Sequence, residues 1–437
     1  MSPETIIAIL LCLGLLALAS GGPIGFLLGG IAMGLAYFSW GPQAFQLVAT
    51  TAKSSVDSFL LLAIPLFVFM GQNLTRSGLG EAMFHAGHVF AGRLRGGLAI
   101  AVIVVCSLIG AMVGIIGAGI MTAGTVALKP MFERGYSRRL ALGTVMAGGG
   151  LGILIPPSVP MIVFASVTQT SVGQMFAAAL IPAAIMIALF VIYIVIYCTI
   201  DPEAGPPLPE EQLGTVADKL SAARDGGMAF LLILIVLGSI LGGIATPTEA
   251  AAIGAVAAIL IAMFYRRYDF GVLKASSIEA MRLTGVIIWI LIGVSVFTNY
   301  MMLSGGGRLF REFAADLGVD PLTVIILMQL SMLVMGFFID EFIIVVICAP
   351  IYTPIAVSLG FDPVWFGILM ILNMEIAIQT PPYGFALFYL KAVAPPDVRM
   401  MEIYRSVGPF VLIKLAVLIL CLLVPEIVTW LPGQLFP

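Results

Sequence analysis

The sequence predicts an all-α polytopic membrane protein of two inverted repeats, each with a re-entrant hairpin and a broken transmembrane helix. Three observations lead to this class. The 437 residues are 61% hydrophobic and 10% charged, with a mean hydropathy of +1.14, whereas soluble chains carry about 25% charged residues. Apolar runs of roughly 20 residues, long enough to cross a ~30 Å hydrocarbon core, recur along the chain. The two halves of the chain also share the same order of features.

A polar stretch rich in proline and acidic residues, 200–225, separates a first half, 1–199, from a second half, 226–437. In the first half, apolar spans and a polar arm helix precede two short apolar legs around a glycine-rich tip, residues 98–130. The legs are too short to cross a membrane, so we expect a hairpin that enters and returns. A span over 138–168 follows, and the stretch GGGLGILIPPS interrupts it.

The second half repeats this order with a hairpin over 321–358 and a broken span over 363–393. Adding 225 to the first Pro-Pro pair, 156–157, gives the second pair, 381–382. Irregular backbone at membrane depth is tolerated only where protein or a water-filled cavity surrounds it. Paired broken segments at matching positions of two halves are typical of a transporter's binding site.

The distribution of basic residues predicts the orientation. When the 200–225 linker is placed in the cytoplasm, the N-terminus is periplasmic and the repeats are inverted. All but three of the 20 lysines and arginines then lie on the cytoplasmic side, Lys414 among them. The exceptions are Lys53, Arg308 and Arg311, and such a bias favours this threading. We therefore expect a multi-pass membrane protein with its N-terminus outside the cytoplasm.

The second half carries the clearest polar candidates. Asp340 and Glu341 lie at the hairpin tip within GFFIDEFIIVVI, and an intramembrane carboxylate is a functional candidate by default. The stretch before the second Pro-Pro pair adds oxygen-bearing side chains at Asn373, Glu375, Gln379 and Thr380. Hard cations prefer oxygen ligands, so these side chains, with carbonyls freed by the break, predict an Na⁺ site. A structural partner for the carboxylates elsewhere in the fold is the alternative.

The first half has no acidic residue at its tip. A cation site there would rest mainly on backbone carbonyls around residues 110–117 and 148–152, with Ser107 and Ser158 nearby. Helix N-termini created at the same breaks would favour an anionic substrate. Close helix packing is the alternative explanation for the glycines. No ATP-binding or hydrolase motif is present, which indicates an ion-driven transporter rather than an enzyme.

Three long motifs resemble the large membrane subunit of tripartite ATP-independent periplasmic (TRAP) transporters. They are KPMFERGYSRRLALGTVMAGGGLGILIPPSVPMIVFA (129–165), GGIATPTEAAAIGA (242–255) and CAPIYTPIAVSLGFDPVWFGILMILNMEIAIQTPPYGFALFYL (348–390). The resemblance implies an elevator-type transporter of the bacterial inner membrane that imports organic acids together with Na⁺. It also implies two partners: a small four-helix membrane subunit, here expected as a separate chain, and a periplasmic substrate-binding protein.

Carried onto this chain, the resemblance implies two Na⁺ sites, each between a hairpin tip and the break of the same half. The candidates for the first are Ser107, Gly110, Gly114, Gly148, Gly149 and Gly152. The candidates for the second are Gly336, Asp340, Gln379 and Thr380, with Asp340 matching the family's acidic residue. The substrate candidates are Ser158, Asn373 and Glu375. The first tip reads MVGIIGAG where many members have a serine-rich tip.

Two other hypotheses for the function are compatible with the sequence. One is a stand-alone carboxylate or anion transporter, driven by ions or protons without a binding protein. The other is an intramembrane enzyme or a passive channel. The sequence does not reveal which carboxylate is carried.

Overall fold

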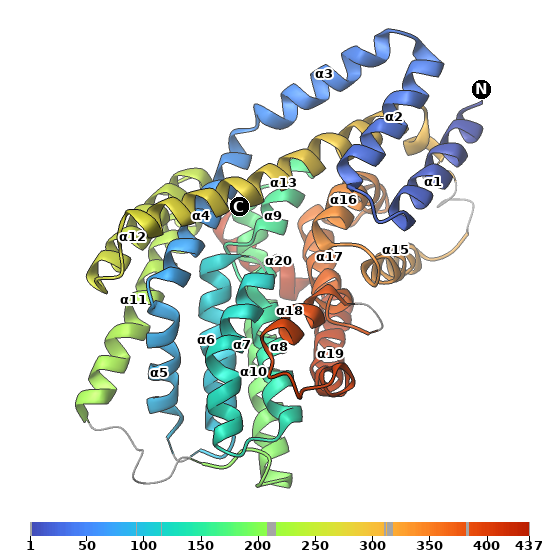
Figure 1. Cartoon of the computed structure of the whole chain (residues 1–437). Coiled ribbons are helices and arrows are strands. Elements are labelled where there is room, and N and C mark those ends of the chain that lie inside the picture. Colours follow the sequence, from blue (N-terminus) through green and yellow to red (C-terminus); the bar gives the residue numbers. More distant parts are fainter. Residues whose placement is uncertain are drawn as a thin grey trace.

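The computed structural model describes residues 2–92, 94–114, 116–207, 216–309, 312, 318–381 and 384–436, and its regular structure there is entirely helical (Figure 1). The first half contains α1 (Pro3–Ala19), α2 (Ile24–Trp40), α3 (Gln43–Val56), η1 (Phe59–Leu62), α4 (Ala63–Arg76), α5 (Leu79–Ala91), α6 (Gly97–Val113), α7 (Ile116–Glu133), α8 (Arg138–Gly150), η2 (Leu151–Ile153), α9 (Val159–Thr168) and α10 (Val172–Ile200). The second half contains α11 (Val216–Leu241), α12 (Pro247–Phe264), α13 (Phe270–Leu303), α15 (Pro321–Gly336), α16 (Glu341–Ser358), α17 (Pro363–Ala377), α18 (Phe385–Val393), α19 (Met400–Leu423) and α20 (Glu426–Leu435).

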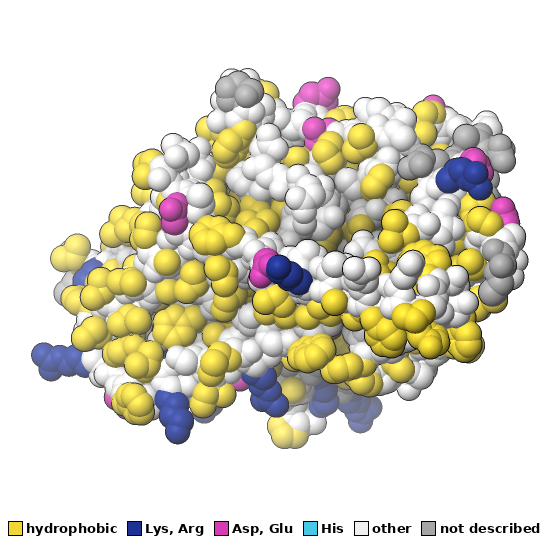
Figure 2. Space-filling model, turned by 90° about the horizontal axis from the view of Figure 1, so that it is seen from above, with side chains coloured by type: hydrophobic (Ala, Val, Ile, Leu, Met, Phe, Trp, Pro, Cys, Tyr) yellow, Lys and Arg dark blue, Asp and Glu magenta, His cyan; other side chains and the backbone are white. Residues whose placement is uncertain are grey.

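The outer surface of the molecule is apolar, as contact with lipid requires. Among the described residues, seven helical segments are long and apolar enough to cross a membrane. Large hydrophobic side chains face outward, with Phe38, Ile200 and Phe270 each more than three-quarters exposed. Figure 2 shows such side chains over much of one face, with few charged groups between them. Soluble monomers rarely expose apolar patches of this extent, so the predicted polytopic class is confirmed.

The internal repeat appears in the helix starts. Helix α7 begins at Ile116 and α16 at Glu341, while α8 begins at Arg138 and α17 at Pro363; both pairs are separated by 225 positions. The packing repeats as well. Helices α6 and α7 both pack on α8, and α15 and α16 both pack on α17. Each half therefore holds a helical hairpin against the first segment of a broken helix.

Local capping explains why the broken helices begin where they do. Ser137 precedes α8 and its Oγ accepts from the Leu140 N–H at 3.3 Å, while Asp362 precedes α17 and its Oδ1 accepts from the Trp365 N–H at 2.9 Å. Ser and Asp are preferred N-caps because their side chains satisfy backbone donors that have no partner within the helix. The same local device therefore starts the equivalent helix in both halves.

Helix α13 is a long arm that crosses the molecule obliquely in Figure 1. Helix α2 packs against it at a contact made of glycines. A Cβ added at Gly25 would lie 2.8 Å from the Trp289 carbonyl oxygen, and one at Gly29 would lie 3.0 Å from the Gly293 Cα. Small residues allow backbones to approach this closely, which is how helices associate within membranes.

Three helix boundaries differ from the sequence prediction. Helix α3 was not predicted, and α11 begins at Val216 inside the predicted linker. Helix α13 begins at Phe270, ahead of the apolar run from residue 283 that predicts a span. All three segments are helical but contain polar residues, such as the TTAKSS run in α3. The prediction followed apolar runs, and a polar or amphipathic helix leaves only a periodic signal.

The arm helix α5, which is not among the seven spanning segments, gives a pH-dependence prediction. His88 Nε2 lies 3.0 Å from Arg134 Nη2, and burial together with the nearby Arg134 charge lowers the pKa of His88 to about 4. Because folding disfavours the charged ring, the stability of the protein should decrease as pH falls from about 6.5 towards 4. We expect His88→Gln to weaken this loss, measured as melting temperature against pH in detergent.

The matched control for this prediction is His85→Gln on the same helix, because the His85 ring is exposed. This control should keep the wild-type dependence. Equal melting curves for wild type and His88→Gln across the whole pH window would contradict the assignment to His88.

Candidate functional site

The first hairpin tip is a glycine turn that lies directly on the first break. Helix α6 ends at Val113, and Gly114 follows with φ of 67°, donating its N–H to the Gly110 carbonyl at 2.8 Å. Gly114 also accepts from the Val159 N–H at 3.4 Å. A Cβ added at Gly114 would lie 2.7 Å from the Pro157 carbonyl oxygen. Only glycine combines this left-handed backbone with so close a neighbour.

Glycines on both elements allow further contacts between tip and break. A Cβ added at Gly110 would lie 2.8 Å from the Gly152 Cα, and one at Gly149 would lie 2.8 Å from the Ile120 Cα. Gly148 faces the side chain of Cys106 instead. The structure thus brings most of the predicted glycines of the first site together, whereas Gly148 packs on a thiol-bearing side chain.

The two serines of the first half have different environments. Ser107 donates its hydroxyl to the Ile103 carbonyl at 2.7 Å, one turn earlier on its own helix. Ser158 is fully buried at the start of α9, and its Oγ has no hydrogen-bond partner among the described residues. A buried polar atom without a partner is uncommon and requires an explanation. Ser158 lies between Pro157 and Val159, the two residues that contact Gly114, and oxygen atoms such as its hydroxyl are the ligands that a small hard cation prefers.

At the second tip, Asp340 is the N-cap of α16. Its Oδ1 accepts from the Phe342 N–H at 3.0 Å, and the next residue, Glu341, is 7% exposed. Helix α15 ends at Gly336, which packs against Ala377 at the end of α17. The second tip therefore contacts the second broken helix, as the first tip contacts the first.

Both tips and the second break share one cavity of about 370 Å³. Ile116 and Gly117 of the first hairpin lie on its wall, with Asp340 and Glu341 of the second. The wall is completed by Phe342, Ile343, Ile378, Phe385, Ala386 and Tyr389 and by Leu283, Val286, Ile287 and Ile290 of α13. No lysine or arginine lines this cavity among the residues that the structure describes. Two carboxylates in an otherwise apolar wall favour a cation.

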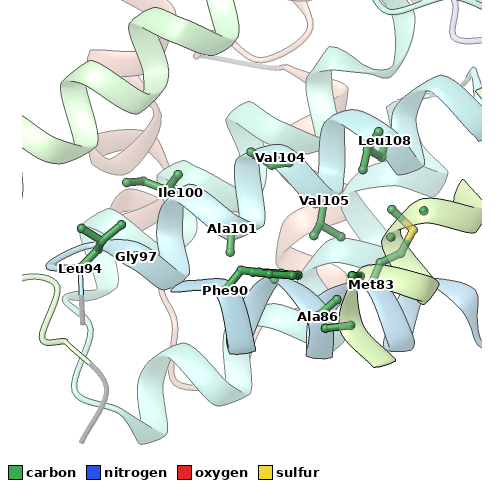
Figure 3. A pocket seen from close by; sticks show the side chains of 15 residues that line it. Met83, Ala86, Phe90, Leu94, Gly97, Ile100, Ala101, Val104, Val105 and Leu108 are labelled. Atoms are coloured by element: carbon green, nitrogen blue, oxygen red, sulfur yellow. The ribbon is translucent and has the colours of Figure 1, made fainter. Parts of the chain in front are cut away.

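A second cavity, of about 470 Å³, lies between α5, α6 and α11 and has a different chemistry (Figure 3). Its wall consists of hydrophobic residues and glycines, including Phe90, Ile100, Val104 and Leu108, and none of its lining side chains is polar. Such a surface cannot compensate the cost of removing a carboxylate from water. This second cavity therefore offers no site for a charged group.

The polar residues before the second break bind other groups of the protein instead of facing that cavity. Thr380 donates to the Ile376 carbonyl at 2.6 Å, and the Asn373 amide donates to the Gln329 backbone and side-chain oxygens at 2.6 and 2.7 Å. Glu375 is fully buried and forms an ion pair with Lys414, Nζ to Oε1 2.7 Å. Neither Asn373 nor Glu375 lines the cavity, so the structure gives no substrate contact to these two candidates.

The position of Lys414 contradicts two predictions made from the sequence. Its side chain is completely buried, so its place among the cytoplasmic basic residues was wrong. It also donates to Gln379 Oε1 at 2.6 Å, so this oxygen, predicted to bind Na⁺, is already engaged. The missed signal was the lysine within FVLIKLAVLIL, because an ionisable residue inside a membrane span is a functional candidate by default. Arg311, expected on the periplasmic side, lies outside the described residues.

Comparison with known proteins gives consistent relatives. Residues 10–427 match the family described as tripartite ATP-independent periplasmic transporter, DctM component. The C4-dicarboxylate TRAP transporter large permease protein of Pseudomonas aeruginosa is 33% identical over 407 residues, covering 93% of this chain and 94% of that protein. The isethionate TRAP transporter permease protein DctMQ of Oleidesulfovibrio alaskensis is 30% identical over 394 residues, covering 90% of this chain and 61% of that longer protein. The solved Alcanivorax borkumensis YdaH transporter, at 14% identity and a TM-score of 0.64 over 90% of each chain, shares the fold.

Proposed function

Because the chain belongs to the family of tripartite ATP-independent periplasmic transporters, as their DctM component, we propose that it is the subunit that carries a small organic acid across the bacterial inner membrane with Na⁺. The N-terminus lies on the periplasmic side. A small membrane subunit and a periplasmic substrate-binding protein complete the transporter. The binding protein docks on the periplasmic side, where Arg308 lies.

One observation supports cation coupling above the others. The cavity between the two hairpin tips contains Asp340 and Glu341 but no basic residue among the described residues of its wall. A carboxylate substrate would meet two acidic side chains there, and negative charge on them raises the free energy of the bound state. A bound cation removes this repulsion, so substrate and cation bind better together than separately. That dependence is the physical basis of symport.

The proposed Na⁺ sites use the contacts between tips and breaks. At the first, the carbonyls of Gly114 and Pro157 and the Ser158 hydroxyl hold the ion. At the second, Asp340 supplies the charge and the freed carbonyls near Thr380 add neutral oxygens. Na⁺ supplies positive charge when bound, and this charge favours an anion in the adjoining cavity.

The substrate site is the cavity itself. The first two residues of α18, Phe385 and Ala386, lie on its wall, and the N-terminal end of a helix favours an anion. The relatives named above transport a C4-dicarboxylate and isethionate, both small organic anions. We propose a substrate of this class, recognised by helix ends and bound cations rather than by an arginine.

Alternating access is proposed to follow from the position of α13. This arm forms one wall of the cavity, while the hairpins and broken helices form the others. Movement of the hairpins and broken helices as one body along α13 would carry the cavity from one side of the membrane to the other.

Reconstitution tests this function. The chain and its small subunit are placed in liposomes, and uptake of radiolabelled dicarboxylate is measured with and without an inward Na⁺ gradient and the cognate binding protein. We expect uptake only when both are present. Uptake without the binding protein would show a stand-alone transporter, and uptake driven by a proton gradient alone would exclude Na⁺ coupling.

A further inference from the structure

The deepest charge in the described part of the molecule lies where the two broken helices meet. Lys414 and Glu375 both have no exposed surface, and Lys414 Nζ lies 2.7 Å from Glu375 Oε1 and 2.6 Å from Gln379 Oε1. Lys414 comes from α19, whereas Glu375 and Gln379 belong to α17 and the turn after it. Helix α19, which is not part of the broken helix, thus places the ammonium group at the second break.

The first break reaches the same point. Helix α8 ends at Gly150, where an added Cβ would lie 2.9 Å from Lys414 Nζ and would collide with Gln379 Nε2. The last carbonyls of a helix lack partners within it and carry a partial negative charge. Lys414 Nζ therefore lies close to the end of α8 as well as to the last turn of α17, with the Phe190 ring centroid 6.0 Å from it.

The groups around the ammonium are those that hold a cation. A carboxylate oxygen and an amide oxygen are within 2.7 Å, and such oxygens are the usual ligands of hard cations. Glu375 Oε2 has no hydrogen-bond partner among the described residues, so the cage is not closed by the protein itself. Stability alone is a weak reason for this arrangement, since hydrophobic residues of similar volume often replace a buried ion pair without loss.

We propose that the Lys414 ammonium is a built-in cation that occupies an oxygen cage between the two breaks, formed by Glu375, Gln379 and the end of α8. This centre takes no ion from solution, because the ammonium group already occupies it. It joins both broken helices through one group. The proposal rests on the proposed function in treating the region between the breaks as cation-binding, but it assigns this position to the protein itself.

The proposal is tested by removing the ammonium group from the oxygen cage. Lys414→Met removes the charge and keeps most of the side-chain volume, which leaves Glu375 facing an oxygen cage without a cation. In the purified complex with the small subunit, at mildly alkaline pH, we expect ²²Na⁺ equilibrium binding to increase by one ion per chain over wild type. The melting temperature of this variant should also rise with Na⁺, relative to choline, more steeply than that of wild type.

The pair Lys414→Met with Glu375→Gln is the matched control. It removes both charges, so the wild-type Na⁺ stoichiometry should return. This pair also keeps the proposal testable if the single variant does not fold, because it leaves no buried charge unpaired. A pair that binds fewer Na⁺ ions than wild type would show that Glu375 itself binds Na⁺ and would overturn the proposal.

A folded Lys414→Met variant with wild-type Na⁺ stoichiometry and the wild-type thermal response would also overturn it. The proposed function is judged separately in this experiment. If the wild-type complex binds no Na⁺ at all, the Na⁺ coupling fails, whereas the difference between wild type and variant still decides the role of Lys414.

Discussion

Asp340→Asn is expected to abolish Na⁺-dependent uptake while the chain still folds and assembles with its small subunit. Asparagine is as good an N-cap as aspartate, so the bond from the Phe342 N–H can be kept. The substitution removes one of the two acidic side chains on the cavity wall. Loss of a buried charge partner costs about 3 kcal/mol, which corresponds to roughly a hundredfold weaker coupling of uptake to Na⁺. Initial uptake rates against Na⁺ concentration in liposomes measure this effect.

The matched control is Asp320→Asn. Asp320 is the N-cap of α15, and its Oδ2 accepts from the Leu322 N–H at 3.0 Å, but the residue is exposed and does not line the cavity. The control repeats the same chemical change in the same capping role, and we expect wild-type uptake from it. Normal Na⁺-dependent uptake by Asp340→Asn would remove this carboxylate from the site.

Gly114→Ala is expected to give the second large effect, a loss of uptake together with a lower melting temperature. The backbone at Gly114 is left-handed, which costs an L-residue about 1–2 kcal/mol. The added methyl would also lie 2.7 Å from the Pro157 carbonyl oxygen, and such overpacking adds about 1–3 kcal/mol. Relief of the clash would separate the first tip from the first break, where we place the first Na⁺ site.

Gly135→Ala separates these two contributions. Gly135 lies in the turn between α7 and α8 with φ of 75°, close to the 67° of Gly114, but no atom lies within 4 Å of an added Cβ. The control therefore has the backbone penalty without the clash. We expect a similar backbone destabilisation and normal Na⁺ dependence. Equal uptake by both variants would show that contact between tip and break is not needed for transport.

The sequence by itself determined the class, the repeat and the family of this protein. Apolar runs predict membrane helices because the bilayer core excludes unpaired backbone groups and charge. The breaks could be located because Gly-rich and Pro-Pro stretches interrupt a helix for local reasons. The shared offset of 225 then predicted the starts of α16 and α17 from those of α7 and α8. Helix α3 was not predicted because it is amphipathic, and its polar residues interrupt any continuous apolar run.

The tertiary structure alone decided which polar group meets which. From the sequence, Glu375 was a candidate for binding substrate and Gln379 for binding Na⁺, whereas in the structure both bind Lys414, which lies 39 and 35 residues further along the chain. Likewise, Asp340 and Ile116 share a cavity wall although more than 200 residues separate them. The local sequence predicts where helices begin and break because these features depend on interactions between residues that are neighbours in the chain. The partner of a buried charge depends on how helices distant in the sequence pack together. In surroundings of low polarity, a buried charge without such a partner is energetically costly.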